Sequence, residues 1–169
     1  MSNILSDLLQ ERGVLLADGA TGSNLFSAGL QTGDSPELWN DIHPDRIAAQ
    51  YSSFITAGSD IILTNTFGGT RYRLGLHSAE DRVAELNIKA AKIARKCVEK
   101  SARTVIVGGS MGPTGEILEP LGSLTKDQAT DALQNFLDHA VWPFAGDDED
   151  STPVDQPMLI KQLSAAGLG

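Results

Sequence analysis

Two hydrophobic periods alternate along this chain. Three segments space their apolar residues by three or four positions, as an amphipathic helix does, and a short apolar run without polar alternation follows each of them. The short runs are residues 14–17, 60–63 and 104–107. Because strands that are buried on both faces lack polar alternation, the pattern predicts an α/β fold with a parallel sheet covered by helices.

The ends of the predicted helices carry their own signals. Proline suits the first turn of a helix, serine its N-terminal cap and glycine the position after its end. Accordingly, Pro44 begins and Gly58 ends the second predicted helix, and Ser78 caps the third. A fourth helical pattern covers residues 127–139.

Each predicted strand ends in a turn rich in small residues, at 18–23, 64–70 and 108–116. In parallel α/β folds, backbone amides and short side chains converge at these carboxyl ends of the strands, and ligands bind there. We therefore expect the three loops to line one mouth.

The character of the sequence changes near residue 142. Residues 1–141 carry the helix and strand patterns, whereas residues 142–169 contain several prolines, a bare acidic run at 147–150 and no further strand–loop unit. We interpret the first range as the structured part and the second as a divergent, irregular tail.

Charge and composition argue against several classes of function. The chain has 169 residues and a formal net charge of −9, which is unfavourable for a surface that binds nucleic acid through clustered Lys and Arg. The basic residues between 89 and 100 are mixed with Glu99, and we interpret them as a solvated helix face. Neither a signal-peptide pattern nor an apolar run of membrane-spanning length occurs, so we expect a cytoplasmic protein that does not bind membranes.

Polar side chains at the strand ends are the candidate site residues. Asp18 follows a predicted strand and precedes a glycine, so it either caps the helix that begins near Gly22 or belongs to a site, and its spacing slightly favours the cap. Thr64, Asn65 and Thr66 form either the end of a strand with an Asx-type turn or a row of ligand-binding groups. Three hydrogen-bonding side chains in succession are more than a turn requires.

The glycine-rich loops are compatible with phosphate binding, since backbone amides at a helix N-terminus hold anions. They contain neither the G-x-G-x-x-G spacing of dinucleotide-binding proteins nor the lysine of a P-loop. A small anion-binding module therefore stays open as a weaker alternative.

The histidines and the single cysteine give little sign of metal or nucleophilic chemistry. His43, His77 and His139 lack metal-ligand spacing, and we interpret them as surface or capping residues. Cys97 lies on the apolar face of the third predicted helix, which favours a buried structural thiol over a nucleophile.

Four motifs together resemble the N-terminal part of the homocysteine S-methyltransferase family, which includes betaine-homocysteine methyltransferase and the homocysteine module of methionine synthase. The motifs are LLADGATGSNL, PELWN followed by HPDRIAAQY, AGSDIILTNTFGGTRYRL and GGSMGPTGE, and the match covers about residues 12–135. A complete (β/α)8 barrel of the TIM type takes about 250 residues. The resemblance therefore implies a partial barrel of about the first three βα units.

The resemblance also implies a substrate pocket for homocysteine. Its residues would be Asp18, Gly19, Thr64, Asn65, Thr66, Phe67 and Ser110. Asp18 and Gly19 would help hold the amino-acid end, while the others would line the pocket.

In the family, zinc held by three cysteine thiolates binds the homocysteine sulfur and keeps it deprotonated for attack on a methyl group. The zinc cysteines lie in later strands, Cys97 does not occupy a ligand position, and the family's acidic residue after a middle strand is missing. We therefore expect no zinc in this chain. The expected function is methyl transfer to homocysteine, giving methionine, from a betaine-type or other donor, in a shortened member that is not competent alone.

A different class of function stays open beside the enzyme. An incomplete parallel sheet leaves an unpaired edge, and such an edge invites pairing with another chain. The alternative is thus a non-catalytic binding or assembly module that associates with itself through the open sheet edge.

Overall fold

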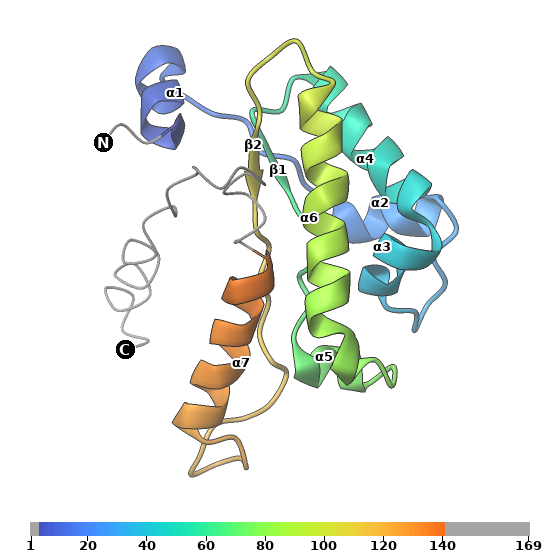
Figure 1. The fold of residues 1–169 in the computed structure, drawn as a ribbon, viewed down its shortest axis with the longest axis vertical. Coiled ribbons are helices and arrows are strands. Elements are labelled where there is room, and N and C mark those ends of the chain that lie inside the picture. The colour runs from blue at the N-terminus through green and yellow to red at the C-terminus, as the bar shows by residue number, and fades with distance from the viewer. Residues whose placement is uncertain (1–3, 141–169) are drawn as a thin grey trace.

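The computed structural model describes residues 4–140. In chain order its elements are α1 (Ile4–Arg12), α2 (Thr21–Ser27), the 3-10 turn η1 (Pro36–Leu38), α3 (Trp39–Ile42), α4 (Pro44–Ala57), β1 (Ile61–Leu63), α5 (Arg71–Gly75), the 3-10 turn η2 (Glu80–Arg82), α6 (Val83–Glu99), β2 (Ile106–Gly108) and α7 (Lys126–Ala140). Figure 1 shows α6 beside the two strands and α4 beyond α6 in this view, with α7 near the end of α6 that carries α5. The α/β class is as predicted.

The sheet consists of β1 and β2, which pair in parallel. Its register joins Ile61 to Ile106, Ile62 to Val107, and Leu63 to Gly108. The chain passes from β1 to β2 through α5 and α6, because parallel strands need a long crossover. Ala17 adds an isolated parallel bridge to Ile61, so residues 14–17 run along the other edge of β1.

The core lies between the sheet and the helices. Ile62 of β1 is fully buried against one cluster, whose other members are Leu25, Leu30, Trp39, Ile47, Tyr51, Ala94, Cys97 and Val105. A second cluster joins α5 to the start of α6 through Leu74, Ala79, Val83 and Leu86. Helical spacing of apolar residues in α4 and α6 thus produces the buried faces that hold the strands in place.

Residues 14–17 were predicted to form a buried strand, and the predicted burial is wrong. The segment forms a single bridge, and Val14 and Leu16 are 78% and 57% exposed. α4 contacts β1 and α6 contacts β2, and Val14 and Leu16 do not belong to the core cluster that these helices form around Ile62. Backbone bonds from Asp60 and Ile61 to the Leu16 carbonyl, at 2.7 and 3.1 Å, still align the segment with β1.

The predicted helices are confirmed, although not every predicted cap is. α4 begins at Pro44, and Gly58 follows it with φ 105°, a conformation that glycine adopts without strain. Ser78 does not cap α6, because η2 intervenes and the long helix begins at Val83. Ser78 instead takes φ 53° in the turn before η2.

The remaining expectations concern the ends and the surface. β2 begins two residues later than predicted, and α7 covers the fourth helical pattern.

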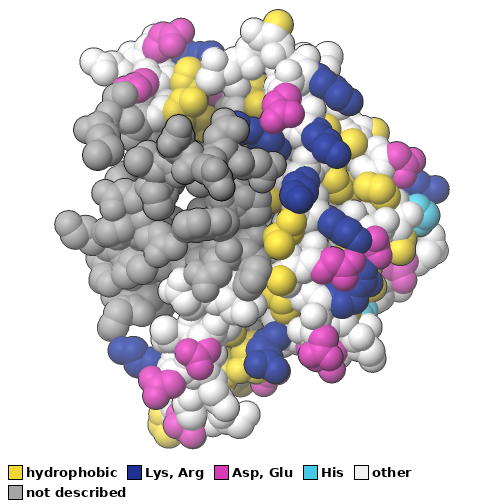
Figure 2. Space-filling model, in the orientation of Figure 1, with side chains coloured by type: hydrophobic (Ala, Val, Ile, Leu, Met, Phe, Trp, Pro, Cys, Tyr) yellow, Lys and Arg dark blue, Asp and Glu magenta, His cyan; other side chains and the backbone are white. Residues whose placement is uncertain are grey.

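Figure 2 shows Lys and Arg side chains along the position of α6 with Asp and Glu beside them, as expected of a solvated face. None of the helices described in residues 4–140 is long and apolar enough to cross a membrane. The tail predicted at 142–169 lies outside the described residues, so the division at 141 stays a prediction.

Candidate functional site at the strand ends

The second and third strand-end loops are fastened to each other by a chain of hydrogen bonds. The Ser110 amide donates to the Thr64 hydroxyl at 3.1 Å, and the Thr66 hydroxyl donates to the Ser110 carbonyl at 2.7 Å. The two threonine hydroxyls lie 2.7 Å apart. Since the single proton of Thr66 is used on Ser110, the hydroxyl of Thr64 donates to that of Thr66.

Asp18 joins the first loop to β1. Its two carboxylate oxygens each lie 3.1 Å from the backbone nitrogen of Leu63 and accept its hydrogen bond. The N-cap of α2 is Ala20, in the left-handed conformation, and no side chain caps that helix. The interpretation of Asp18 as a helix cap is therefore wrong. Burial raises the pKa of the Asp18 carboxyl, and the bond from Leu63 partly opposes this rise.

A hollow of about 340 Å³ opens beside these loops. Of the predicted residues, those that line it are Thr64, Asn65, Phe67 and Ser110. Thr66 is fully buried behind them. Asp18 and Gly19 do not line the hollow, although Thr21 and Gly22 of the same loop do. The three loops thus converge as expected, and the first contributes through its later residues.

A larger hollow, of about 510 Å³, lies between α2 and α4. Its lining includes Arg46, Gln50 and Ser53 but none of the strand-end residues. Ligand sites in parallel α/β folds form at the carboxyl ends of strands. The smaller hollow is therefore the better candidate.

Asn65 is held by residues that the sequence did not single out. Its backbone N–H donates to the Tyr51 hydroxyl at 2.7 Å, and its side-chain amide donates to Asn40 Oδ1 at 3.0 Å and the Pro36 carbonyl at 2.7 Å. Asn40 returns a bond to the Asn65 carbonyl at 2.9 Å. Burial raises the pKa of Tyr51, which keeps the phenol neutral as an acceptor. Apolar periodicity identified Tyr51 only as a core residue.

Glu37 is the second group that sequence reasoning missed. Its Oε1 accepts a bond from the Gly68 N–H at 2.7 Å, and its Oε2 accepts one from the Ser35 hydroxyl at 2.7 Å. All three residues line the hollow, together with the exposed Arg73. Glu37 belongs to the PELWN motif, which was a signal of family resemblance but not of this contact.

The described side chains do not bring together metal ligands. Across residues 4–135, no group of three or more His, Cys, Asp or Glu is placed to hold a metal ion. Cys97 is buried in the core, with Sγ 3.6 Å from the Ala48 carbonyl. The His43 ring contacts the Trp39 ring edge-on, with centroids 4.8 Å apart. This donor set does not fit a zinc site built from three thiolates.

Sequence comparisons place these features among known proteins. The model of the homocysteine S-methyltransferase family matches residues 15–145. The methionine synthase of Mycobacterium tuberculosis (strain ATCC 25618 / H37Rv) is 34% identical over 178 aligned positions, which cover 98% of this chain and 14% of the relative. The methionine synthase of Mycobacterium leprae (strain TN) is 29% identical over 181 aligned positions, which cover 99% of this chain and 14% of that relative. The chain spans about one seventh of the length of these relatives.

Solved structures agree on the fold. The metallated form of the homocysteine methyltransferase MmuM from Escherichia coli superposes with a TM-score of 0.67 at 22% identity, covering 81% of this chain and 54% of that one. The oxidised form gives a TM-score of 0.64 at 24% identity, with 82% and 54% covered.

Proposed function

This chain belongs to the homocysteine S-methyltransferase family, as the match over residues 15–145 shows, and on that premise we propose that its strand-end hollow binds homocysteine. We also propose that residues 14–17, β1 and β2 correspond to the first three strands of a partial (β/α)8 barrel; the parallel pairing of β1 with β2 and the parallel bridge of Ala17 to Ile61 support this assignment. The observation that carries the proposal is the bonded pair of loops around Thr64, Thr66 and Ser110 at the edge of the hollow.

The predicted residues fall into two roles in this proposal. Those that line the hollow, Thr64, Asn65, Phe67 and Ser110, contact the substrate. Thr66 positions the loop from behind, since its side chain is fully buried. Asp18 and Gly19 do not line the hollow, so their role at the amino-acid end stays a prediction, and Asp18 supports the first loop through its bonds to the Leu63 amide.

The reaction class that we assign to the family fold is methyl transfer to homocysteine, giving methionine, from a betaine-type or other donor. The three thiolates of the family's zinc site cannot come from a sequence with one cysteine, and that cysteine is buried in the core. We therefore propose that this chain binds homocysteine without zinc and does not transfer a methyl group by itself. A cytoplasmic location stays a prediction from the sequence.

Binding of L-homocysteine to the full chain, measured by titration calorimetry, tests this proposal. Phe67 is 60% exposed at the hollow, so Phe67→Ala should fold normally and weaken binding about fivefold or more through lost apolar contact. The matched control is Phe26→Ala, because Phe26 is 52% exposed on α2 and does not line the hollow. Binding of a nucleoside triphosphate in place of homocysteine would instead favour the anion-binding alternative.

Assembly is the second candidate function. Val14, Leu16 and Leu63 are apolar side chains along the strands that are 78%, 57% and 37% exposed. Exposed apolar strands invite pairing with another chain. The mass of the calorimetry sample in solution, from light scattering, separates the cases: a defined oligomer supports self-association through the sheet, and a monomer opposes it.

A further inference from the structure

The hollow contains a buried carboxylate that the proposed roles leave unused. Glu37 is 6% exposed and lines the hollow from η1. One of its oxygens accepts a bond from the Gly68 amide and the other accepts a bond from the Ser35 hydroxyl, both at 2.7 Å. A carboxylate has about four acceptor positions. Each oxygen of Glu37 therefore retains capacity for a further donor.

Glu37 forms no ion pair with any described cationic side chain. Two other carboxylates among the described residues have such partners: the buried Asp60 pairs with Arg12 and Arg103, and the half-buried Asp41 pairs with Arg82 and Lys89. Because a buried charge without a counter-charge is costly, such groups in folded proteins are usually paired. The charge of Glu37 is thus available for a cation that a ligand brings.

The backbone of the substrate loop fixes this carboxylate in place. A Cβ atom on Gly68 would lie 2.9 Å from Glu37 Oε1 and 3.1 Å from its carboxyl carbon. The missing side chain lets Gly68 lie directly against the carboxylate and donate to it. Glu37 is consequently held beside Asn65 and Phe67, the loop residues that line the same hollow.

Other charged groups that line the hollow indicate a zwitterionic ligand. Arg73 lines it as a guanidinium with no ion pair among the described residues, and its side chain lies over Gly115, where a Cβ would be 3.4 Å from Cδ. His77 and the exposed Asp34 also line the hollow. A ligand with both an ammonium and a carboxylate group matches this mixture of one buried negative charge and one accessible positive charge.

We propose that Glu37 determines substrate specificity by pairing with the ammonium group of an α-amino-acid ligand in this hollow. The inference rests on the proposed function and extends it, because it assigns the recognition of the amino group to a residue before α3. The ammonium donates to the free acceptor positions of Glu37, while Gly68 and Ser35 hold the carboxylate still.

The test compares two ligands that differ only in the amino group, L-homocysteine and 4-sulfanylbutanoate, in titration calorimetry with the full chain. Wild type should bind L-homocysteine about tenfold or more tightly than the analogue, as a charge-assisted bond implies. Glu37→Gln keeps acceptor and shape but removes the charge, so it should abolish most of this preference and leave binding of 4-sulfanylbutanoate unchanged. Glu11→Gln, an exposed position on α1, is the control and should behave as wild type.

The outcomes separate the two proposals. If wild type binds both ligands equally, the inference fails whether or not the variant folds. If Glu37→Gln weakens both ligands by the same factor, Glu37 has only a structural role and the inference fails while homocysteine binding stands. If wild type binds neither ligand, the proposed function fails and the inference with it.

Discussion

At the scale of single residues, the glycine pair after β1 places the loop against two different side chains. Gly68 lies against Glu37, and Gly69 lies against Asn87 of α6, whose amide donates to the Gly69 carbonyl at 3.0 Å. A Cβ on Gly69 would approach Asn87 Oδ1 to 2.2 Å and the backbone carbonyl of Thr66 to 2.9 Å. The backbone contact cannot be relieved by rotating a side chain.

We therefore expect Gly69→Ala to destabilise the fold by about 1–3 kcal/mol, the usual cost of overpacking. The matched control is Gly22→Ala, because a Cβ there meets nothing within 4 Å and alanine favours the helix α2. Chemical denaturation followed by circular dichroism measures both variants. Equal stability of Gly69→Ala and wild type would show that the loop has room to move.

Residue-level prediction relied on the position of polar side chains at a strand end. Three successive polar residues there predicted a site, and Thr64 and Asn65 line the hollow, while their binding role stays a prediction. Asn40 was not predictable as a partner of Asn65, nor Glu37 as a partner of Gly68, because these contacts join residues 25 and 31 positions apart in the sequence. Only the fold brings those contacts together.

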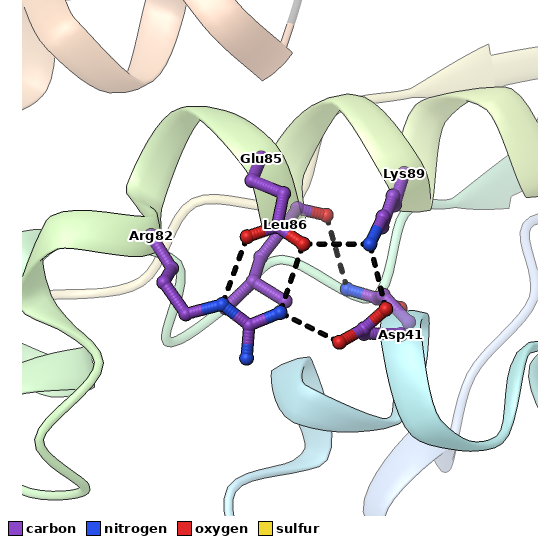
Figure 3. Close-up of polar contacts among 6 residues, drawn as sticks. Asp41, Arg82, Glu85, Leu86 and Lys89 are labelled. Carbon is purple, nitrogen blue, oxygen red and sulfur yellow. Dashed lines mark hydrogen bonds and ion pairs between the residues drawn. The ribbon is translucent and has the colours of Figure 1, made fainter.

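At the scale of elements, a network of four charged side chains joins α3 to α6. Figure 3 shows Asp41 of α3 facing Arg82 and Lys89, which in turn reach Glu85. The ion pairs of Asp41 measure 2.6 Å to each cation, and Glu85 lies 2.8 and 2.6 Å from the same two groups. Hydrogen bonds from Lys89 and Arg82 lower the pKa of Asp41. The network fixes the helix that also carries Asn40, the partner of Asn65.

Asp41→Asn should lower the thermal midpoint of unfolding at low salt, and the difference from wild type should shrink at about 1 M salt, where charges are screened. The pKa of Asp41 is lowered in the fold, so its contribution is present above its ordinary value of 3.8 and is lost as the pH falls through the lower folded value. The difference should thus shrink in acid as well. Asp131→Asn, at an exposed position of α7, serves as control, and a salt-independent difference would contradict an electrostatic role.

Elements were predictable to the extent that their signals are local. Pro44 and Gly58 fix the ends of α4, because each acts through its own backbone geometry. The burial of residues 14–17 was not predictable, since it depends on what packs against the second face of the sheet. Ser78 failed as a cap for a similar reason: the chain makes an extra 3-10 turn before α6 begins.

At the scale of the whole molecule, the described residues form a small parallel sheet and the helices that pack against it. The order of residues 14–17, β1 and β2 directs three loops to one end, and there the hollow forms. The repeat of helix and apolar run predicted this α/β architecture, and the resemblance predicted the family. The shape of the hollow and the burial of its carboxylate could be identified only from the packed structure.

The most direct test of the central claim locates L-homocysteine on the full, isotope-labelled chain by two-dimensional NMR. The account predicts that the ligand shifts the amide resonances of Asn65, Phe67, Gly68 and Ser110 in a saturable manner, without added zinc, and leaves those of α1 unchanged. Shifts confined to Arg46, Gln50 and Ser53, around the hollow between α2 and α4, would contradict it, as would the absence of any shift at saturating ligand.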